Sequence, residues 1–142
     1  MTFSTSTVTS EESVSTEAPT ILLLDDDSTT LLVLHTILEG TDAHIIECED
    51  ETSAVHMSEQ VGKPIDLVVA DVVLQDTNGP AVVRRIKRSH PLARLLFISG
   101  FNVSELHKRG LLSPKDLAEG SAEFLQKPFS SEEFIARVNK LL

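Results

Sequence analysis

Three consecutive carboxylates follow a short apolar run near the start of the sequence. The stretch ILLLDDDS places Asp25, Asp26 and Asp27 directly after four aliphatic residues. Like charges this close repel by about 1 kcal/mol per pair in water, and by about 4 kcal/mol at an effective dielectric of 20. A solvated loop tolerates this repulsion, whereas the end of a buried strand does not. The stretch therefore predicts a neighbouring positive charge, either a basic side chain or a bound cation.

Three further reactive side chains stand at the ends of later apolar runs. Asp71 ends PIDLVVAD, Ser99 lies near the end of ARLLFISG, and Lys127 ends AEFLQK. Carboxylate oxygens are the ligands that Mg²⁺ prefers in proteins. A cation, an ammonium group and a hydroxyl donor around one carboxylate would neutralise and position a phosphoryl group during transfer. If these runs end at one place, Asp71 becomes the nucleophile that forms an acyl phosphate.

The order of the apolar runs predicts how these side chains are brought together. From Thr20 onward, short apolar runs alternate with amphipathic ones. Strands are expected at 21–24, 43–48, 64–71, 93–100 and 122–127. Helices are expected at 28–40 (with Ser28 as N-cap), 51–60, 79–91, at the start of 102–120, and at 130–142 (with Ser130 or Ser131 as N-cap). Gly110 and Pro114 interrupt the fourth helical segment.

Apolar strands that alternate with helices indicate an α/β protein whose parallel sheet is covered on both faces. Right-handed crossovers leave few topologies for five such units, and the flavodoxin-like, doubly wound order 2-1-3-4-5 is the natural one. In this order the carboxyl ends of strands 1, 3, 4 and 5 are neighbours. The three carboxylates Asp25, Asp26 and Asp71 are then expected beside Ser99 and Lys127.

Composition limits the class of protein. The 142 residues are 41% apolar, which suits one globular domain. Residues 1–19 are mostly Ser, Thr and Glu and are predicted to be a disordered leader, followed by a domain at 20–142. A single cysteine, Cys48, excludes an internal disulfide and suits a reducing compartment. The net charge of −10 argues against nucleic-acid binding, and no membrane span or signal peptide is expected, so a cytoplasmic location is predicted.

Over about residues 20–142, the sequence resembles the receiver domain of two-component response regulators. The resemblance rests on ILLLDDDS, DLVVADVVLQDTNG, LLFISG and GSAEFLQKPF, which occur in this order at the predicted strand ends. Gly79 follows Asp71 by eight residues, Pro128 follows Lys127, and Phe124 precedes Lys127 by three. Each motif is weak alone, but together they are specific.

The resemblance implies roles for individual residues. Asp71 would accept a phosphoryl group from a kinase phosphohistidine, assisted by Lys127 and Ser99. The implied ligands of Mg²⁺, for which Mn²⁺ can substitute, are Asp25, Asp26, Asp71 and the backbone carbonyl of Val73. Asp27 falls outside this set and is expected to cap the first helix. Ser99 and Phe124 would form the switch pair.

The resemblance also bears on phosphoryl lifetime and on partners. The residues that tune self-dephosphorylation would be Val73 and Phe101, and because neither can hydrogen-bond water, slow self-dephosphorylation is expected. Self-phosphorylation and self-dephosphorylation would be the only catalytic activities. The implied partners are a histidine kinase or phosphotransfer protein and a downstream protein, with homodimer formation on phosphorylation as one outcome. No nucleic acid or membrane is expected as a partner.

The sequence departs from the family pattern in two places. Gln75 stands where receivers usually have proline, four residues after Asp71. The interval between Ser99 and Lys127 is longer than usual, and the form SGF…HKRGLL…FLQKPF is similar to receiver modules of hybrid histidine kinases.

Two other functions fit parts of the sequence. The first is a phosphatase of the haloacid dehalogenase type, in which Asp25 would be the nucleophile and Asp27 the acid. The second is an interaction module that works without phosphorylation. Simpler structural roles also exist for single residues: Phe124 as a core residue, Ser99 as a strand-end cap, and the basic stretch RRIKR as a solvated helix face.

Overall fold

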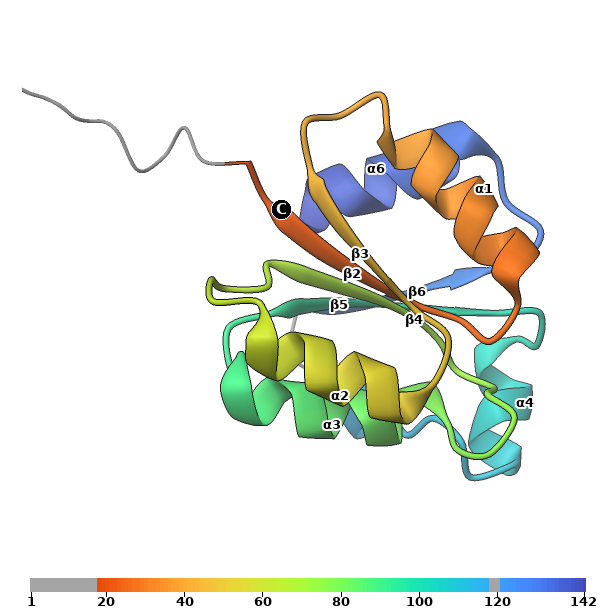
Figure 1. Cartoon of the computed structure of the whole chain (residues 1–142). Helices are drawn as coiled ribbons and strands as arrows, with labels where there is room; N and C mark the ends of the chain where they lie inside the picture. The colour runs from red at the N-terminus through yellow and green to blue at the C-terminus, as the bar shows by residue number, and fades with distance from the viewer. Residues whose placement is uncertain (1–17, 118–120) are drawn as a thin grey trace, which may run out of the picture.

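The structure is a computed structural model that describes residues 18–117 and 121–142. Its centre is a parallel sheet of five strands (Figure 1). The strands are β2 (Thr20–Leu24), β3 (His44–Cys48), β4 (Leu67–Asp71), β5 (Arg94–Ser99) and β6 (Ala122–Gln126). They lie in the order β3-β2-β4-β5-β6, which is 2-1-3-4-5 in chain order. The predicted flavodoxin-like order is confirmed.

Helices cover both faces of the sheet. They are α1 (Ser28–Leu38), α2 (Glu51–Gln60), α3 (Gly79–Ser89), α4 (Val103–Lys108), α5 (Pro114–Leu117) and α6 (Ser131–Leu141). Helices α1 and α6 lie on one face, whereas α2 and α3 lie on the other (Figure 1). None of the helices in the described part of the chain is long and apolar enough to cross a membrane.

The sheet divides the core into two apolar clusters. In β2, Leu22 and Leu24 belong to the cluster under α2 and α3, whereas Ile21 and Leu23 belong to the cluster under α1 and α6. This split follows from the period of two in a strand. All four side chains are at most 1% exposed. Because burial of a leucine or isoleucine side chain stabilises the fold by about 1.5–3 kcal/mol, β2 is firmly held where the carboxylates begin.

Several predicted boundaries need correction. The strands expected at 64–71, 93–100 and 122–127 are shorter, so that Lys127 lies one residue beyond β6. The N-cap of α1 is Asp27, which confirms the role expected for Asp27 and corrects Ser28, because the Asp27 carboxylate accepts a hydrogen bond from the Thr29 backbone N–H at 3.0 Å. At α6 the N-cap is Ser130, one of the two candidates.

The interval between β5 and β6 holds two short helices, α4 and α5, separated by Gly110 at φ +72°. Residues 118–120 of this interval and 1–17 of the predicted leader lie outside the described residues. The division into a leader at 1–19 and a domain at 20–142 therefore stays a prediction.

Charged side chains accompany both edge strands. On β6, the Glu123 carboxylate lies 2.6 Å from the Lys140 ammonium and 3.6 Å from the Arg137 guanidinium. Arg137 also donates a hydrogen bond to the backbone carbonyl of Phe124 at 2.6 Å. On β3, Glu47 is exposed and pairs with His35 of α1. Acidic side chains of both edges are thus bound to side chains from the neighbouring helices.

Candidate functional site

Four strands end together at one edge of the sheet. Asp71 is the last residue of the central strand β4, and it is paired in register with Ile98 of β5. Asp25 follows β2 on one side, and Ser99 ends β5 on the other. The Lys127 backbone N–H donates to the Ser99 carbonyl at 2.8 Å, which places Lys127 beside β5. The structure thus brings Asp25, Asp71 and Lys127 together, with Ser99 at the adjoining strand end, whereas in the described residues the exposed Asp26 does not complete a group of three carboxylates with Asp25 and Asp71.

Lys127 supplies the positive charge that the acidic stretch required. Its ammonium nitrogen lies 3.1 Å from Asp71 Oδ2 and 3.5 Å from Asp25 Oδ2. Partial burial acts to lower the pKa of Lys127, but the charges of Asp71 and Asp25 outweigh this effect and raise it above its ordinary value. Lys127 therefore remains an ammonium group that bridges two carboxylates.

Asp25 is the carboxylate whose negative charge is disfavoured by its surroundings. Its side chain is only 4% exposed, and Oδ1 accepts a hydrogen bond from the Asp27 backbone N–H at 2.9 Å. Burial raises the pKa of Asp25 from 3.8 to about 6; the Asp27 N–H acts to lower it, Asp71 to raise it and Lys127 to lower it. One ammonium group does not fully offset the burial and the neighbouring carboxylate.

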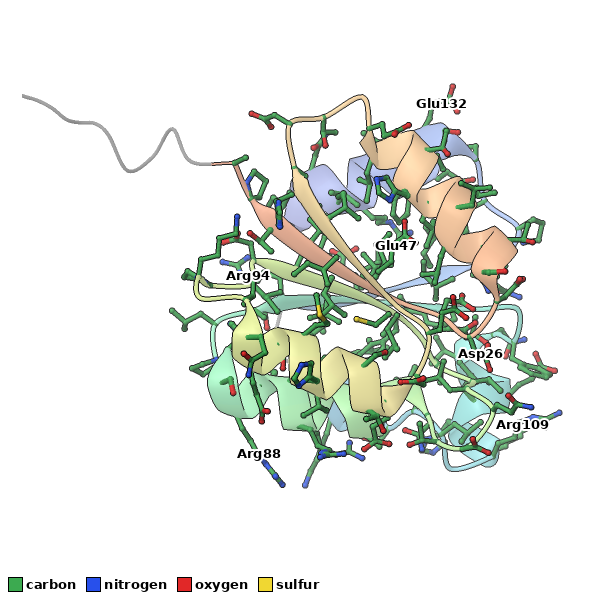
Figure 2. All side chains as sticks on the ribbon, viewed as in Figure 1. Asp26, Glu47, Arg88, Arg94, Arg109 and Glu132 are labelled. Atoms are coloured by element: carbon green, nitrogen blue, oxygen red, sulfur yellow. The ribbon has the colours of Figure 1, made fainter. Side chains whose placement is uncertain are left out.

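The other two members of the acidic run have different surroundings. Asp26 is exposed and lines a cavity of about 390 Å³ together with Gln75, Asp76 and side chains from the start of α2. Asp27 serves as the helix cap described above. Figure 2 places Asp26 at the same end of the sheet as Arg109, whereas Arg94 lies at the opposite end.

The loop after β4 holds Asp71 in place. Asp71 Oδ1 accepts a hydrogen bond from the Val73 backbone N–H at 3.0 Å, and Oδ2 faces Lys127. Val73 and Asn78 form an isolated antiparallel bridge, and the Gly79 N–H donates to the Val72 carbonyl at 2.9 Å. The loop thus folds back against the strand end and brings Gly79 close to the Asp71 backbone.

Gly79 lies too close to Asp71 to carry a side chain. A Cβ atom at this position would lie 2.3 Å from the Asp71 carbonyl oxygen and 3.1 Å from its carbonyl carbon. Because backbone atoms cannot move aside cheaply, Gly79→Ala is expected to destabilise the fold by about 1–3 kcal/mol. Chemical denaturation measures this loss. Gly100, where an added Cβ would meet nothing within 4 Å, provides the matched Gly100→Ala control. Equal stability of both variants would contradict the crowding.

Ser99 and Phe124, the expected switch pair, lie on neighbouring strands of the sheet. Ser99 is 1% exposed, and its Oγ accepts a hydrogen bond from the Phe101 backbone N–H at 3.1 Å. Phe124 is paired in register with Phe97, two residues before Ser99, so Phe124 and Ser99 lie on the same face of the sheet. Phe124 is half-buried against the cluster under α2 and α3. The arrangement suits a switch and a core residue equally, so the role stays a prediction.

The donor groups fit Mg²⁺ in kind. No group of three His, Cys, Asp or Glu side chains that could hold a metal is found within residues 18–117 and 121–142. Mg²⁺, however, uses one or two carboxylates with waters and substrate oxygens. The raised pKa of Asp25 reflects a site that favours additional positive charge. The expected ligand set of Asp25, Asp26, Asp71 and the Val73 carbonyl is thus chemically suitable and stays a prediction.

Two contacts near the site were not predicted from the sequence. Arg85 of α3 pairs with Glu51 of α2, and both side chains line the cavity beside Asp26. The Arg109 guanidinium lies over the Phe101 ring, with 4.3 Å between its carbon and the ring centroid. Arg85 lies in the basic stretch RRIKR, whose pattern favours a solvated helix face, and Arg109 is eight residues from Phe101, a spacing that indicates no contact.

Comparison with known proteins gives consistent matches. The profile of the response regulator receiver domain matches residues 21–139. The sensor kinase CckA of Brucella abortus (strain 2308) is 29% identical over 123 residues, which are 87% of this chain and 12% of that protein. The transcriptional regulatory protein TrcR of Mycobacterium tuberculosis is 31% identical over 86% of this chain and 44% of its own length. The chain thus spans less than half of either relative.

Solved structures show the same fold. The receiver domain of the hybrid histidine kinase CckA has a TM-score of 0.69 at 23% identity, covering 87% of this chain and 99% of that one. The chemotaxis protein CheY4 of Vibrio cholerae has a TM-score of 0.74 at 17% identity, covering 89% and 100%. The two CckA matches agree with the resemblance to receivers of hybrid histidine kinases. With the family profile covering most of its length, the chain belongs to the family of response regulator receiver domains.

Proposed function

We propose that this receiver domain takes a phosphoryl group from the phosphohistidine of a histidine kinase or phosphotransfer protein onto Asp71, in a reaction that requires Mg²⁺. The observation that carries the proposal is the Lys127 ammonium group, held against both Asp71 and the buried Asp25. A lysine placed in this way neutralises charge at the Asp71 carboxylate, whose side chain is 12% exposed and so stays partly open to solvent.

The transfer forms one bond and breaks another. An Asp71 carboxylate oxygen attacks phosphorus, and the bond between phosphorus and the imidazole nitrogen breaks, with the nitrogen keeping the electron pair. Lys127 offsets negative charge on the Asp71 side of the reacting centre. Because Ser99 Oγ already accepts from the Phe101 N–H, its own hydrogen is available to donate to a phosphoryl oxygen. The protein's contribution is therefore positioning and charge neutralisation.

The metal would be held by Asp25, Asp26, Asp71 and the Val73 carbonyl, with Mn²⁺ as a substitute for Mg²⁺. When bound, the cation supplies positive charge to the phosphoryl oxygens. It would also relieve the unfavourable burial of the Asp25 charge, which Lys127 alone does not offset.

A labelling experiment tests the proposal. The chain is incubated with a small acyl-phosphate donor and Mg²⁺, and the expected result is a mass gain of one phosphoryl group that maps to Asp71. The same incubation with a chelator is expected to give no gain. A label on Asp25 would support the phosphatase instead, and a chain that takes no label with Mg²⁺ would support the phosphorylation-independent module.

The phosphatase function is disfavoured by the surroundings of the acidic run. In that function Asp27 would be the acid beside an Asp25 nucleophile. In the structure the Asp27 carboxylate instead accepts hydrogen bonds from the Thr29 N–H and the Thr30 hydroxyl, both at 3.0 Å. Asp27 is therefore engaged as a helix cap.

The lifetime of the phosphorylated form is expected to be long. Val73 is 38% exposed beside Asp71, and Phe101 is half-buried on the loop after Ser99. Neither side chain can orient the water that attacks phosphorus. A Val73→Asn, Phe101→Glu double variant should release phosphate about tenfold faster, the factor given by one added hydrogen bond of roughly 1.4 kcal/mol in the transition state. Phosphate release over time measures this, and equal rates in the two proteins would contradict it.

The partners and location follow from the same proposal. A histidine kinase or phosphotransfer protein donates the phosphoryl group, and the phosphorylated domain acts through a downstream protein, with homodimer formation as one form of output. The expectations that nucleic acid and membranes are not partners, and that the chain works in the cytoplasm, stay predictions.

A further inference from the structure

Helix α4 is short, yet both of its ends are closed by local hydrogen bonds. At the N-terminus, Asn102 and Glu105 form a capping box: the Glu105 N–H donates to the Asn102 side chain at 2.9 Å, and the Asn102 N–H donates to the Glu105 carboxylate at 3.0 Å. At the C-terminus, the Gly110 N–H donates to the His107 carbonyl at 3.0 Å and the Leu111 N–H to the Leu106 carbonyl at 2.9 Å. This is a Schellman motif, which uses the positive φ of Gly110.

One aromatic contact joins the residues that flank this helix. Phe101 immediately precedes the N-cap Asn102, and Arg109 is the C-cap residue. The Arg109 guanidinium carbon lies 4.3 Å from the centre of the Phe101 ring, which is a cation–π geometry. Phe101 and Leu106 also occupy the positions of a hydrophobic staple and belong to the same apolar cluster. The caps fix the Arg109 backbone, and the Arg109 guanidinium in turn lies over one face of the ring.

The backbone of Phe101 is tied to the end of β5, the strand next to β4. The Val72 N–H donates to the Ile98 carbonyl at 2.9 Å, so the ends of β4 and β5 run side by side. The Phe101 N–H is bonded to Ser99 Oγ. The ring packs against the cluster that contains Val72 and Leu74, the two buried neighbours of Val73. Arg109 lies at this end of the sheet in Figure 2.

We propose that Arg109 is a positioning residue that holds Phe101 at the rim of the phosphoacceptor site and so lengthens the lifetime of phosphorylated Asp71. The proposal rests on the proposed function. In hydrolysis, a water oxygen bonds to phosphorus, the bond from phosphorus to the Asp71 oxygen breaks with its electrons left on the carboxylate, and inorganic phosphate leaves with the water's oxygen. A ring held in place limits the approach of this water, whereas a released ring moves with the loop.

Rates of phosphate release from a set of variants test the proposal. Arg109→Met is expected to speed phosphate release about two- to fivefold, which is the change in rate that corresponds to the energy of one exposed cation–π contact. Arg109→Lys keeps a cation that can lie over the ring, and its rate should be closer to that of the wild type. Lys108→Met removes an exposed positive charge from the neighbouring position and should leave the rate unchanged. A rate for Arg109→Met equal to that of Lys108→Met overturns the proposal.

A double-mutant cycle separates positioning from a structural role. In a Phe101→Leu background the contact is absent, so Arg109→Met should add no further increase in rate. Equal fold-changes in the two backgrounds overturn the proposal, because Arg109 would then act without Phe101. In the unphosphorylated protein, NMR should show Arg109 side-chain protons shifted upfield by the ring, and Phe101→Leu should remove that shift; an unshifted wild type also overturns it.

These results distinguish the role of Arg109 as a positioning residue from the proposed function of the domain. A wild-type chain that takes no label from the donor refutes phosphoryl transfer and the lifetime claim together. If the chain is labelled on Asp71 but the Arg109→Met and Phe101→Leu effects on the rate of phosphate release are independent, only the role of Arg109 is refuted.

Discussion

The Asp71→Asn variant is expected to take no phosphoryl label from an acyl-phosphate donor and Mg²⁺. An amide lacks the anionic oxygen that attacks phosphorus, and no neighbouring group in the described site can replace it in the same position. The fold should persist, because asparagine keeps an oxygen that accepts from the Val73 N–H, and Lys127 keeps its contact with Asp25. We expect a melting temperature within about 4 °C of the wild type, since a change of 1 kcal/mol shifts a domain of this size by a few degrees.

Intact mass and thermal melting measure these two outcomes. Asp42→Asn is the matched control, because Asp42 is an exposed carboxylate in the turn between α1 and β3 and should leave labelling unchanged. Persistent labelling of the Asp71→Asn protein would mean that another residue is the nucleophile. If the Asp71→Asn variant does not fold, Asp71→Glu is used in its place. This variant is expected to melt like the wild type and to lose or slow its labelling.

The Asp25→Asn variant of the metal-free protein is expected to be more stable than the wild type at neutral pH. The pKa of Asp25 is raised to about 6 in the folded state from an ordinary value of 3.8, chiefly by burial. The folded state therefore binds the Asp25 proton more tightly than the unfolded state does. This difference adds to the free energy of unfolding, and its contribution is complete below about pH 4. It is lost as the pH rises through about 6. At 1.36 kcal/mol per pKa unit, the loss is about 3 kcal/mol.

Asparagine mimics the protonated carboxyl and does not titrate. The difference in unfolding free energy between Asp25→Asn and the wild type should therefore be near zero at pH 4 and grow to about 3 kcal/mol above pH 7. Urea unfolding in the presence of a chelator, at a series of pH values, measures this difference. Added Mg²⁺ should reduce it by stabilising the wild type. A difference that is constant from pH 4 to pH 8 would contradict a strained, buried carboxylate.

Much of the site follows from residue order alone. The predicted strands that end at or beside Asp25, Asp71, Ser99 and Lys127 must, in a doubly wound parallel sheet, end at one edge. The sequence therefore predicts which side chains meet, since topology brings the strand ends together whatever the loops do. The pair between Lys127 and Asp71 is a consequence of that topology and is found as expected.

Other features depend on three-dimensional detail that one chain does not display. Asp25, Asp26 and Asp27 are identical in type, and only burial shows that Asp25 bears the strain while Asp26 faces solvent. The sequence offered both Asp27 and Ser28 as caps of the first helix, and only the hydrogen bond from the Thr29 N–H to the Asp27 carboxylate decides between them. The contact of Arg109 with Phe101 depends on the turn at Gly110, which the sequence shows only as an interruption.

The paired side chains along both edges of the sheet affect how the chain behaves when it is concentrated. An edge strand presents unpaired backbone groups that can add a strand from another molecule, which is a common route to aggregation. On β6, Arg137 donates a hydrogen bond to the Phe124 carbonyl, and Glu123 pairs with both Arg137 and Lys140 alongside the strand. On β3, Glu47 and His35 place a polar pair beside the opposite edge. An incoming strand would have to displace Arg137 from the Phe124 carbonyl before it could pair with β6, so this side chain also protects the folded domain against fibril-like stacking at that edge.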